Sequence, residues 1–263
     1  MARTTSDDVL QRFCVSPRTQ EIYANWERDP RRADVAPIVM KHQTKLVYEL
    51  TTAEVEAVCR RTEHALGQVK RSDGEKVAAI VDWHPDFAFT HMFHVCMEQM
   101  QCLPAYQDFR AYAYSHPLGL KMLGDPAKAK VWEVADRGIS EQLVRDAMRW
   151  RVGNAYYSFL REVYTVVQLR SMGIDLRVHP LADALFRVDA WVDDKVVSLR
   201  VGNKKFRQGD AAGRKMPPER LLTDVLPPFE FDTIELSPAT KFGAVHLPSS
   251  EHIAGAAARL SGP

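Results

Sequence analysis

Asp189 lies in a segment whose other residues favour a β-strand. Between Phe186 and Val192, apolar residues alternate with polar ones, a pattern typical of a strand with one apolar face. Acidic residues are depleted in strands. This carboxylate therefore indicates either a functional group or half of a structural ion pair, for instance with Arg200 on the next predicted strand. Glu162, on a predicted helix upstream, is a second candidate, with a solvated surface acid as the alternative interpretation.

The elements that would position these carboxylates begin with a helix capped by Asn154 and ending at Met172-Gly173. Short β-type segments, a further helix and a further strand follow. The predicted elements after this helix are Ile174–Val178, Phe186–Val192, Val196–Val201, Pro218–Val225, Phe229–Leu236 and Ser250–Leu260. The sequence therefore predicts an α+β fold, with a mainly helical region at residues 1–150 and an α-β-β-β-α-β core at residues 151–263.

The order of helix, three strands, helix and strand, with the strand segments Gly173–Arg177, Phe186–Val192 and Val196–Val201, resembles the core of the PD-(D/E)XK nuclease superfamily. In that family a helix glutamate, an aspartate on the second strand and an acid-x-lysine on the third strand converge on one or two Mg²⁺ ions. The family also includes components of bacterial defence and mobile-element systems. The resemblance implies a protein that acts on nucleic acid.

Carried over residue by residue, the resemblance implies that Glu162 and Asp189 are the metal-binding acids. Ser198 falls on the third-strand acid position and Arg200 on the lysine position. Serine supplies no anionic charge to a metal, and arginine does not act as a base as lysine does. We therefore expect binding or assembly rather than cleavage, with an active Mg²⁺-dependent DNA or RNA endonuclease, in which Glu162, Asp189 and Arg200 are catalytic, as the alternative. Asp183 is an alternative to Asp189 as the motif aspartate.

Basic residues follow the third predicted strand. Between residues 195 and 220 there are eight basic and two acidic residues, a local balance of +6 in a chain whose net charge is +1. A near-neutral chain has no global attraction to nucleic acid, so local clustering must supply it. We expect DNA or RNA phosphates to contact the cluster Lys204, Lys205, Arg207, Arg214 and Lys215. The alternative is a loop kept soluble by its charges.

The first half of the chain is expected to be helical after an irregular, charge-rich start of about 48 residues. The predicted helices are Thr52–Leu66, Phe87–Leu103, Tyr106–Leu123 and Ser140–Trp150, and Lys76–Trp83 is either a strand or a buried helix. Aromatic residues at Tyr106, Phe109, Tyr112 and Tyr114, with Arg110, are either a base-stacking surface or core and interface packing. The latter would make the chain a protein–protein scaffold or a homo-oligomer through these helices.

His91 and His94 are one helical turn apart and could face one metal ion, although the neighbouring aromatic residues favour core packing. The apolar fraction of 46% and the absence of a long apolar run indicate a soluble protein with no membrane partner. The four cysteines form no CxxC pair, which favours reduced thiols and a cytoplasmic location.

Overall fold

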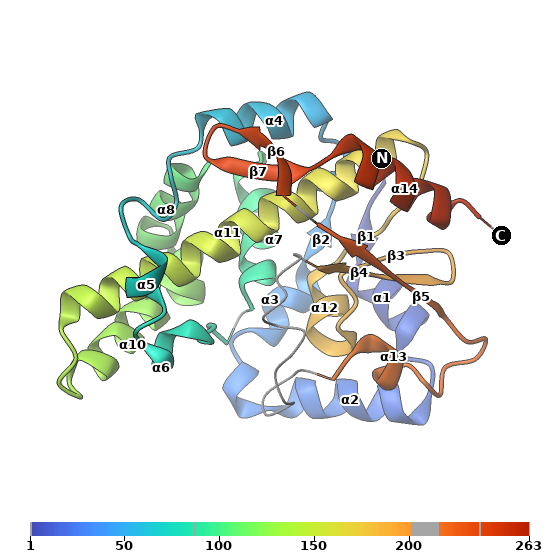
Figure 1. Cartoon of the computed structure of the whole chain (residues 1–263). Coiled ribbons are helices and arrows are strands. Elements are labelled where there is room, and N and C mark those ends of the chain that lie inside the picture. The colour runs from blue at the N-terminus through green and yellow to red at the C-terminus, as the bar shows by residue number, and fades with distance from the viewer. Residues whose placement is uncertain (1, 87, 201–215, 237, 263) are drawn as a thin grey trace. The chain divides into compact units, whose positions relative to one another are not determined.

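A computed structural model describes residues 2–86, 88–200, 216–236 and 238–262. The protein is α+β: helices dominate its first half, and the three-stranded sheet and a second, two-stranded sheet lie in its C-terminal half. The chain divides into two compact units, whose elements are labelled in Figure 1. Unit 1 comprises Met1–Thr52, Arg161–Lys241 and His246–Pro263, and unit 2 comprises Ala53–Leu160 and Phe242–Val245.

The start of unit 1 is helical, so the expectation of an irregular segment over the first 48 residues is wrong. Thr5, the residue before α1, accepts a hydrogen bond from Asp8 N at 3.3 Å, and Asp8 Oδ2 accepts one from Thr5 N at 2.7 Å, which together form a capping box. Ser16 and Thr19 cap α2 in the same way, with a proline at its first position. The elements here are β1 (Thr4–Thr5), α1 (Ser6–Phe13), α2 (Pro17–Arg28), η1 (Pro30–Arg32), α3 (Ala36–Lys41), β2 (Gln43–Thr44) and η2 (Leu46–Tyr48).

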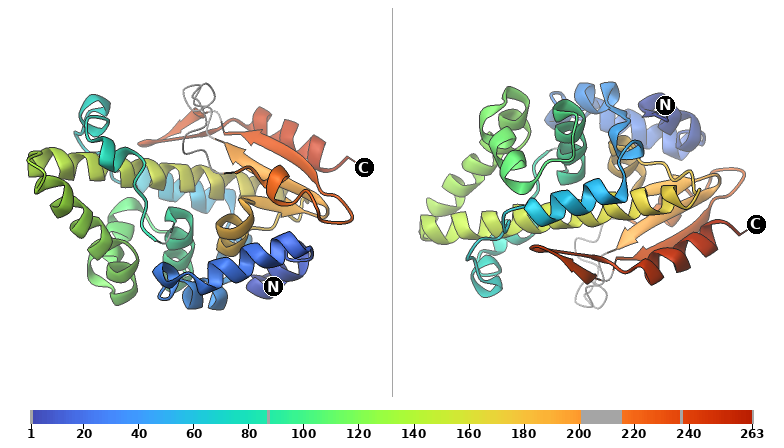
Figure 2. Two further views of the ribbon diagram at one scale, coloured as in Figure 1. Left: turned by 90° about the horizontal axis from the view of Figure 1, so that it is seen from below. Right: turned by 90° about the horizontal axis from the view of Figure 1, so that it is seen from above.

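The three-stranded sheet of unit 1 has the order β3-β4-β5. Its strands are β3 (Ala190–Val192), β4 (Lys195–Arg200) and β5 (Glu230–Glu235), with α13 (Pro218–Leu221) before β5. β3 pairs with β4 antiparallel, whereas β4 pairs with β5 parallel, with Ser198 opposite Thr233. In both views of Figure 2, α14 (Ser250–Leu260) runs beside this sheet, and Arg259 Nε contacts Asp232 Oδ2 of β5 at 3.1 Å.

Two of the predicted strands are corrected. Ile174–Val178 forms no strand and contributes a single antiparallel bridge, Arg177 to Trp191. Phe186 ends a helix, α12 (Pro180–Phe186), and only residues 190–192 of the predicted strand are extended. The second change follows from α12, because a proline at the first helical position starts the helix and the left-handed Arg187 (φ 60°) follows its last residue.

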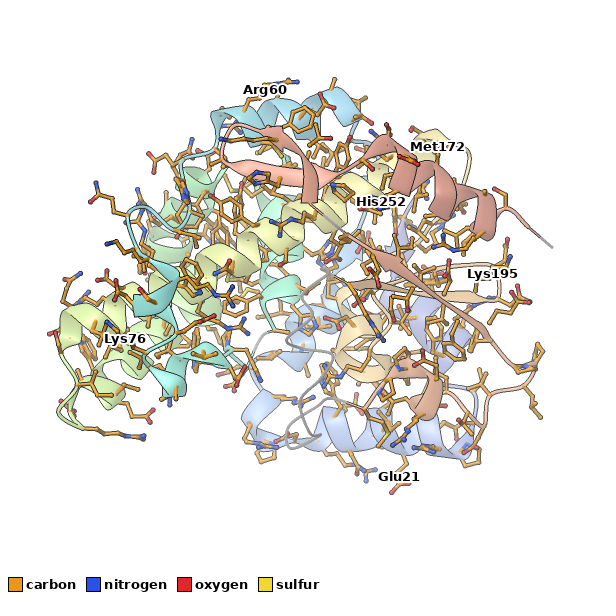
Figure 3. The ribbon with its side chains drawn as sticks, in the orientation of Figure 1. Glu21, Arg60, Lys76, Met172, Lys195 and His252 are labelled. Atoms are coloured by element: carbon orange, nitrogen blue, oxygen red, sulfur yellow. The ribbon has the colours of Figure 1, made fainter. Side chains whose placement is uncertain are left out.

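An aromatic core holds the elements of unit 1 together. The Phe13 ring of α1 lies 5.7 Å from Phe186 of α12, 5.3 Å from Trp191 of β3 and 5.2 Å from Phe229. Lys195, labelled in Figure 3 at the start of β4, donates from Nζ to the Arg259 carbonyl of α14 at 3.3 Å. Burial of such large apolar rings is the main source of stability in a unit of this size.

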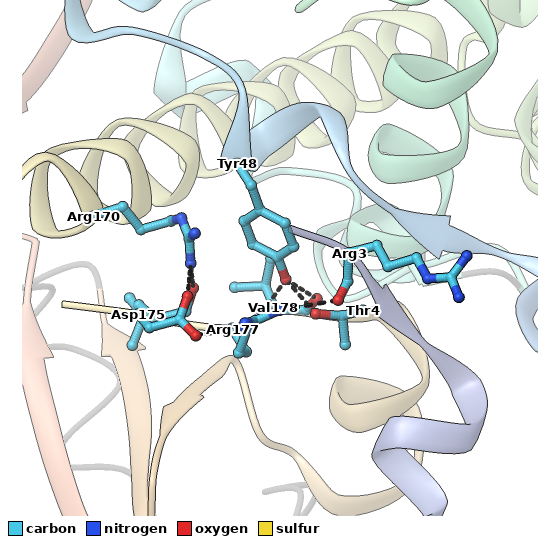
Figure 4. A network of polar contacts seen from close by, with 8 residues as sticks. Arg3, Thr4, Tyr48, Arg170, Asp175, Arg177 and Val178 are labelled. Atoms are coloured by element: carbon cyan, nitrogen blue, oxygen red, sulfur yellow. Dashed lines mark hydrogen bonds and ion pairs between the residues drawn. The ribbon is translucent and has the colours of Figure 1, made fainter. Parts of the chain in front are cut away.

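The phenol of Tyr48 joins the N-terminal segment to the chain that follows α11 (Glu141–Ser171), as Figure 4 shows. Its hydroxyl donates to the Val178 carbonyl at 3.0 Å, accepts from Val178 N at 3.0 Å and contacts Thr4 Oγ1 at 2.7 Å. The Arg170 guanidinium lies over the ring at 4.4 Å from its centroid. These contacts show why residues 1–52 belong with the C-terminal core, so that the units do not follow the predicted division at residue 150.

Unit 2 is built on the part of the long helix α11 (Glu141–Ser171) that precedes residue 161. Phe93 of α7 lies 4.6 Å from Phe109 of α8 and 4.8 Å from Phe159 of α11, centroid to centroid. The remaining elements are α4 (Thr52–Arg61), α5 (Arg71–Gly74), α6 (Ala78–Val81), α7 (Phe89–Met100), α8 (Tyr106–Ser115), α9 (Pro117–Gly119), a π-helical segment (Leu120–Gly124) and α10 (Asp125–Ala135). The undecided segment 76–83 therefore contains a short helix, α6.

The predicted helix start at Asn154 is wrong, because α11 is continuous through it. Gly153 allows a close approach: a side chain there would lie 2.7 Å from Leu66 and 3.1 Å from the backbone of Ala65. Asn154 Nδ2 donates to the Trp150 carbonyl of the same helix at 2.7 Å.

The second sheet pairs β6 (Pro238–Phe242) with β7 (Val245–Pro248). Across the described parts of the chain, none of the helices has the length and apolar character to cross a membrane.

Candidate functional site

Asp189 lies where the chain leaves α12 and enters β3. The helix starts at Pro180, where the preceding His179 accepts a hydrogen bond from Leu181 N at 3.0 Å. The last residue of the helix is Phe186, and the left-handed conformation of Arg187 then changes the direction of the chain. Asp189 follows at a bend just before the first strand residue, Ala190. It is thus on the second-strand segment that the sequence predicts, one residue outside the strand.

The carboxylate of Asp189 reaches the neighbouring strand β4. Its Oδ2 accepts a hydrogen bond from Leu199 N at 2.7 Å. Leu199 lies between Ser198 and Arg200, the two residues that the resemblance aligns with the third-strand acid and lysine. Ser198 is 6% exposed, and Arg200 at the end of the strand is exposed. The hydrogen bond therefore holds the Asp189 carboxylate beside residues 198–200 of β4.

Like charges surround this carboxylate. Burial is the largest cause that raises the pKa of Asp189 well above its ordinary value, and the negative charges of Asp183 and then Glu162 raise it further. The Leu199 N–H and the positive charge of Arg200 act in the opposite direction but do not outweigh them. A carboxyl in this environment keeps its proton to a higher pH than an ordinary surface acid does.

Three elements bring these acids together: Glu162 comes from α11, Asp183 from α12 and Asp189 from the entry to β3. The sequence predicts the first and third of these residues as partners and has Asp183 only as a substitute for Asp189. In the structure Asp183 acts on Asp189 more strongly than Glu162 does. The proline at the start of α12 is the sequence signal that could have revealed this, because it makes residues 180–186 a helix rather than a turn.

Within the described residues, no three His, Cys, Asp or Glu side chains form a group that could hold a metal ion. The alternative metal site at His91 and His94 is therefore not formed as a cluster of this kind. Both residues are buried in unit 2, 3% and 2% exposed, and His94 packs edge-on against Phe159 with ring centroids 5.5 Å apart. Glu162 and Asp189 remain the pair predicted to hold a metal.

The predicted phosphate-binding cluster, Lys204, Lys205, Arg207, Arg214 and Lys215, lies outside the described residues. A second cationic feature of unit 1 lies elsewhere, in a hollow of about 390 Å³ lined by Arg3, Arg12 and Arg177 with Asp8 and Trp191. Its three arginines and single acid give it a balance of +2 among these lining residues. The sequence interpretation missed this feature, because its cations are far apart in the chain.

Comparison of the chain with known protein families, with curated proteins and with solved structures found no match.

Proposed function

We propose that this protein binds nucleic acid through unit 1, using a nuclease-like core with a degenerate motif. The observation that carries the proposal is the hydrogen bond from Leu199 N to Asp189 at 2.7 Å, together with the effect of Glu162 on the same carboxyl. The hydrogen bond joins Asp189 to the centre of β4, and the negative charge of Glu162 from α11 acts on the same carboxyl, which supports this interpretation of the motif. The hairpin of β3 and β4, followed by α13 and the parallel strand β5, supports the same core.

Cations available to phosphates adjoin this core. Arg200 is exposed at the end of β4 and leads in sequence into the cluster that begins at Lys204. Arg3 is exposed at the hollow described above, which Arg12 and Arg177 also line; the Arg177 guanidinium is itself bonded to Asp175 and to the Arg3 carbonyl. Guanidinium groups bind phosphate oxygens in a bidentate manner. The serine in place of the third-strand acid favours binding over cleavage, because it removes one of the negative charges that would hold a metal ion.

The experiment that tests binding is fluorescence anisotropy of labelled single-stranded DNA, duplex DNA and RNA, measured over a range of salt concentrations. Each duplex phosphate contact contributes about 0.9 to the slope of log affinity against log salt. The triple variant Lys204→Ala/Lys205→Ala/Arg207→Ala should therefore flatten the duplex slope by about 2 to 3. The matched control Lys70→Ala/Arg71→Ala/Lys76→Ala removes the same charge from an exposed part of unit 2 and should leave the slope unchanged.

Absence of binding to all three nucleic acids at low salt would overturn the proposal. An equal loss of affinity in the triple variant and in its control would also count against it, since it would show a response to net charge alone.

A second candidate function is Mg²⁺-dependent cleavage, which the acidic neighbours of Asp189 favour. The donor types suit such an ion, because carboxylate oxygens are the ligands that Mg²⁺ prefers, and the negative charges of Asp183 and Glu162 act on the Asp189 carboxyl in addition to its burial. Glu162 and Asp189 would hold the ion, and Asp183 would add negative charge beside them. When bound, Mg²⁺ would polarise a phosphate and neutralise its charge. Arg200 would orient the phosphate without acting as a base.

Cleavage is tested by incubating labelled DNA and RNA with Mg²⁺ or Mn²⁺ and separating the products. Asp189→Asn and Glu162→Gln should abolish any cleavage, whereas Asp194→Asn, in the exposed turn between β3 and β4, should not. Cleavage that persists in Asp189→Asn would show that the site is assigned wrongly. Binding without cleavage in the unaltered protein would exclude this second function and leave the first one standing.

A further inference from the structure

Unit 2 contains a pocket of about 460 Å³ between α8, α10 and α11, which Figure 1 labels. Its apolar wall includes Phe109 of α8, Leu123 of the π-helical segment and Val131 of α10, 1%, 4% and 6% exposed. α11 adds Met148 and Val152. This volume is within the range of small-molecule sites, about 300 to 1,000 Å³. The pocket belongs to neither feature of unit 1 described above.

The edge of this pocket is cationic and aromatic. Arg110, Lys128, Arg145 and Arg149 line it, and among the described lining residues there is no acid. Arg110, Lys128 and Arg145 do have carboxylate partners outside the pocket, but these ion pairs are exposed. Exposed ion pairs contribute about 0 to 1 kcal/mol, so these three side chains can turn toward an anion at little cost.

Two large aromatic side chains that line the pocket are exposed to solvent. Trp132 is 57% exposed and Tyr114 is 52% exposed. The Lys128 ammonium lies 5.7 Å from the centre of the Tyr114 ring, so the aromatic ring and the cation form one surface. An exposed tryptophan beside an apolar cavity is a common feature of ligand sites. The aromatic run of α8 is thus divided: Phe109 is buried, whereas Tyr114 faces solvent.

Arg149 is the most firmly positioned of the four cations. Its Nε donates to the Ala65 carbonyl at 3.2 Å. Gly67 lies against its guanidinium, because a Cβ at this position would be 2.4 Å from Arg149 Nη2. A guanidinium has five N–H donors, and this backbone contact uses one of them. A cation fixed by backbone beside an apolar wall favours a charged ligand group at one end of the pocket.

We infer that this pocket binds a small amphipathic anion, an apolar body with a single carboxylate, sulfonate or phosphate group. The apolar wall would take the body, and Arg110, Arg145 and Arg149 would take the charged group. A nucleotide is a poorer match, because the side chains of the apolar wall, Phe109, Leu123, Val131, Met148 and Val152, offer a base no hydrogen-bonding partner. The inference does not depend on nucleic-acid binding by unit 1.

The test is displacement of the fluorescent probe anilinonaphthalene sulfonate from the full chain by decanoate. Decanol is the uncharged control ligand and adenosine monophosphate the nucleotide control. We expect decanoate to displace the probe at a concentration about tenfold lower than decanol does, because a charge-assisted hydrogen bond discriminates by at least this factor. Arg145→Gln should weaken decanoate about tenfold. Arg137→Gln, which breaks a similar i,i+4 ion pair outside the pocket, should have no effect.

Two further variants separate loss of the pocket from loss of the fold. Ala127→Phe fills the pocket from α10, and Trp132→Ala removes an exposed side chain whose loss should change stability by at most about 0.5 kcal/mol. Both should weaken decanoate, with thermal unfolding of Trp132→Ala unchanged. The inference is overturned if Arg137→Gln and Arg145→Gln behave alike, if decanol matches decanoate, or if the nucleotide displaces the probe at lower concentration than decanoate.

Discussion

A relay of buried hydrogen bonds fixes the start of α8 against α11 and provides the sharpest test of unit 2. Tyr106 N donates to Thr62 Oγ1 at 2.9 Å, Thr62 Oγ1 lies 2.9 Å from Tyr156 Oη, and Tyr156 Oη donates to the Pro104 carbonyl at 2.9 Å. Because the tyrosine proton is used on Pro104, the Thr62 hydroxyl must donate to Tyr156. The relay therefore runs in one direction and every member has a defined role.

Tyr156→Phe removes one hydroxyl and breaks two buried hydrogen bonds: the Pro104 carbonyl loses its donor, and the Thr62 hydroxyl, which still accepts from Tyr106 N, loses the acceptor of its proton. Each such loss costs about 1 to 3 kcal/mol, so the free energy of unfolding should fall by about 2 to 6 kcal/mol. The ring itself stays packed, because its contacts with Phe93 and Tyr106, at 5.9 and 5.3 Å between centroids, do not involve the hydroxyl. The loss is therefore a polar effect rather than a cavity effect.

The assay is urea unfolding followed by circular dichroism, with Tyr114→Phe as the control. Tyr114 is in the same unit and is 52% exposed, so its hydroxyl can bond to water and the variant should change stability by at most about 0.5 kcal/mol. The double variant Tyr156→Phe/Thr62→Val should lose less than the sum of the single variants, because both singles break the same contact. A loss below about 1 kcal/mol for Tyr156→Phe, or additive effects, would refute the relay.

Two further predictions concern unit 1. Asp189→Asn should raise the free energy of unfolding at pH 8 but not at pH 3. The pKa of Asp189 is higher in the native protein than in the unfolded chain, so at a pH between these two values the native protein binds more protons. The free energy of unfolding therefore falls as the pH rises through this window. The loss is about 1.4 kcal/mol for each unit by which the two pKa values differ. Urea midpoints at both pH values measure this, and an equal gain at both would contradict it. Tyr48→Phe should cost about 2 to 4 kcal/mol, because its hydroxyl bonds both the amide and the carbonyl of Val178. Hydrogen exchange should show faster exchange of the Val178 amide, and unchanged exchange would be the contrary result.

The α+β class could be predicted from the sequence because it depends on residues close in the chain. The β-type residues of Val196–Val201 predict β4, and the period of the apolar residues predicts helices within residues 52–66 and 87–103. The caps of α1 and α2 were also visible in the sequence, in Thr5 with Asp8 and in Ser16 with Thr19. The first 48 residues were nevertheless predicted to be irregular, because a charge-rich surface helix with few apolar residues has a sequence pattern similar to that of an irregular segment.

The errors lie where a local rule competes with a contact between distant residues. Gly153 and Asn154 favour a helix boundary, but the glycine instead allows the close approach of Ala65 and Leu66. Alternation from Phe186 to Val192 favours one strand, yet the left-handed Arg187 divides the segment between α12 and β3. A single sequence does not encode such a φ angle in a recognisable form, because arginine adopts it only when surrounding packing imposes it.

The same distinction explains the candidate site. Asp189 could be found because an acid in an apolar strand is unusual, but the strength of Asp183 as its neighbour depends on α12, which has no counterpart in the predicted elements. A carboxylate held beside two others lowers the stability of the native state, and asparagine could accept the same Leu199 N–H without that cost. Stability alone therefore does not account for an aspartate at this position. A gain of stability in Asp189→Asn, combined with loss of metal-dependent activity, would identify Asp189 as a functional residue rather than a structural one.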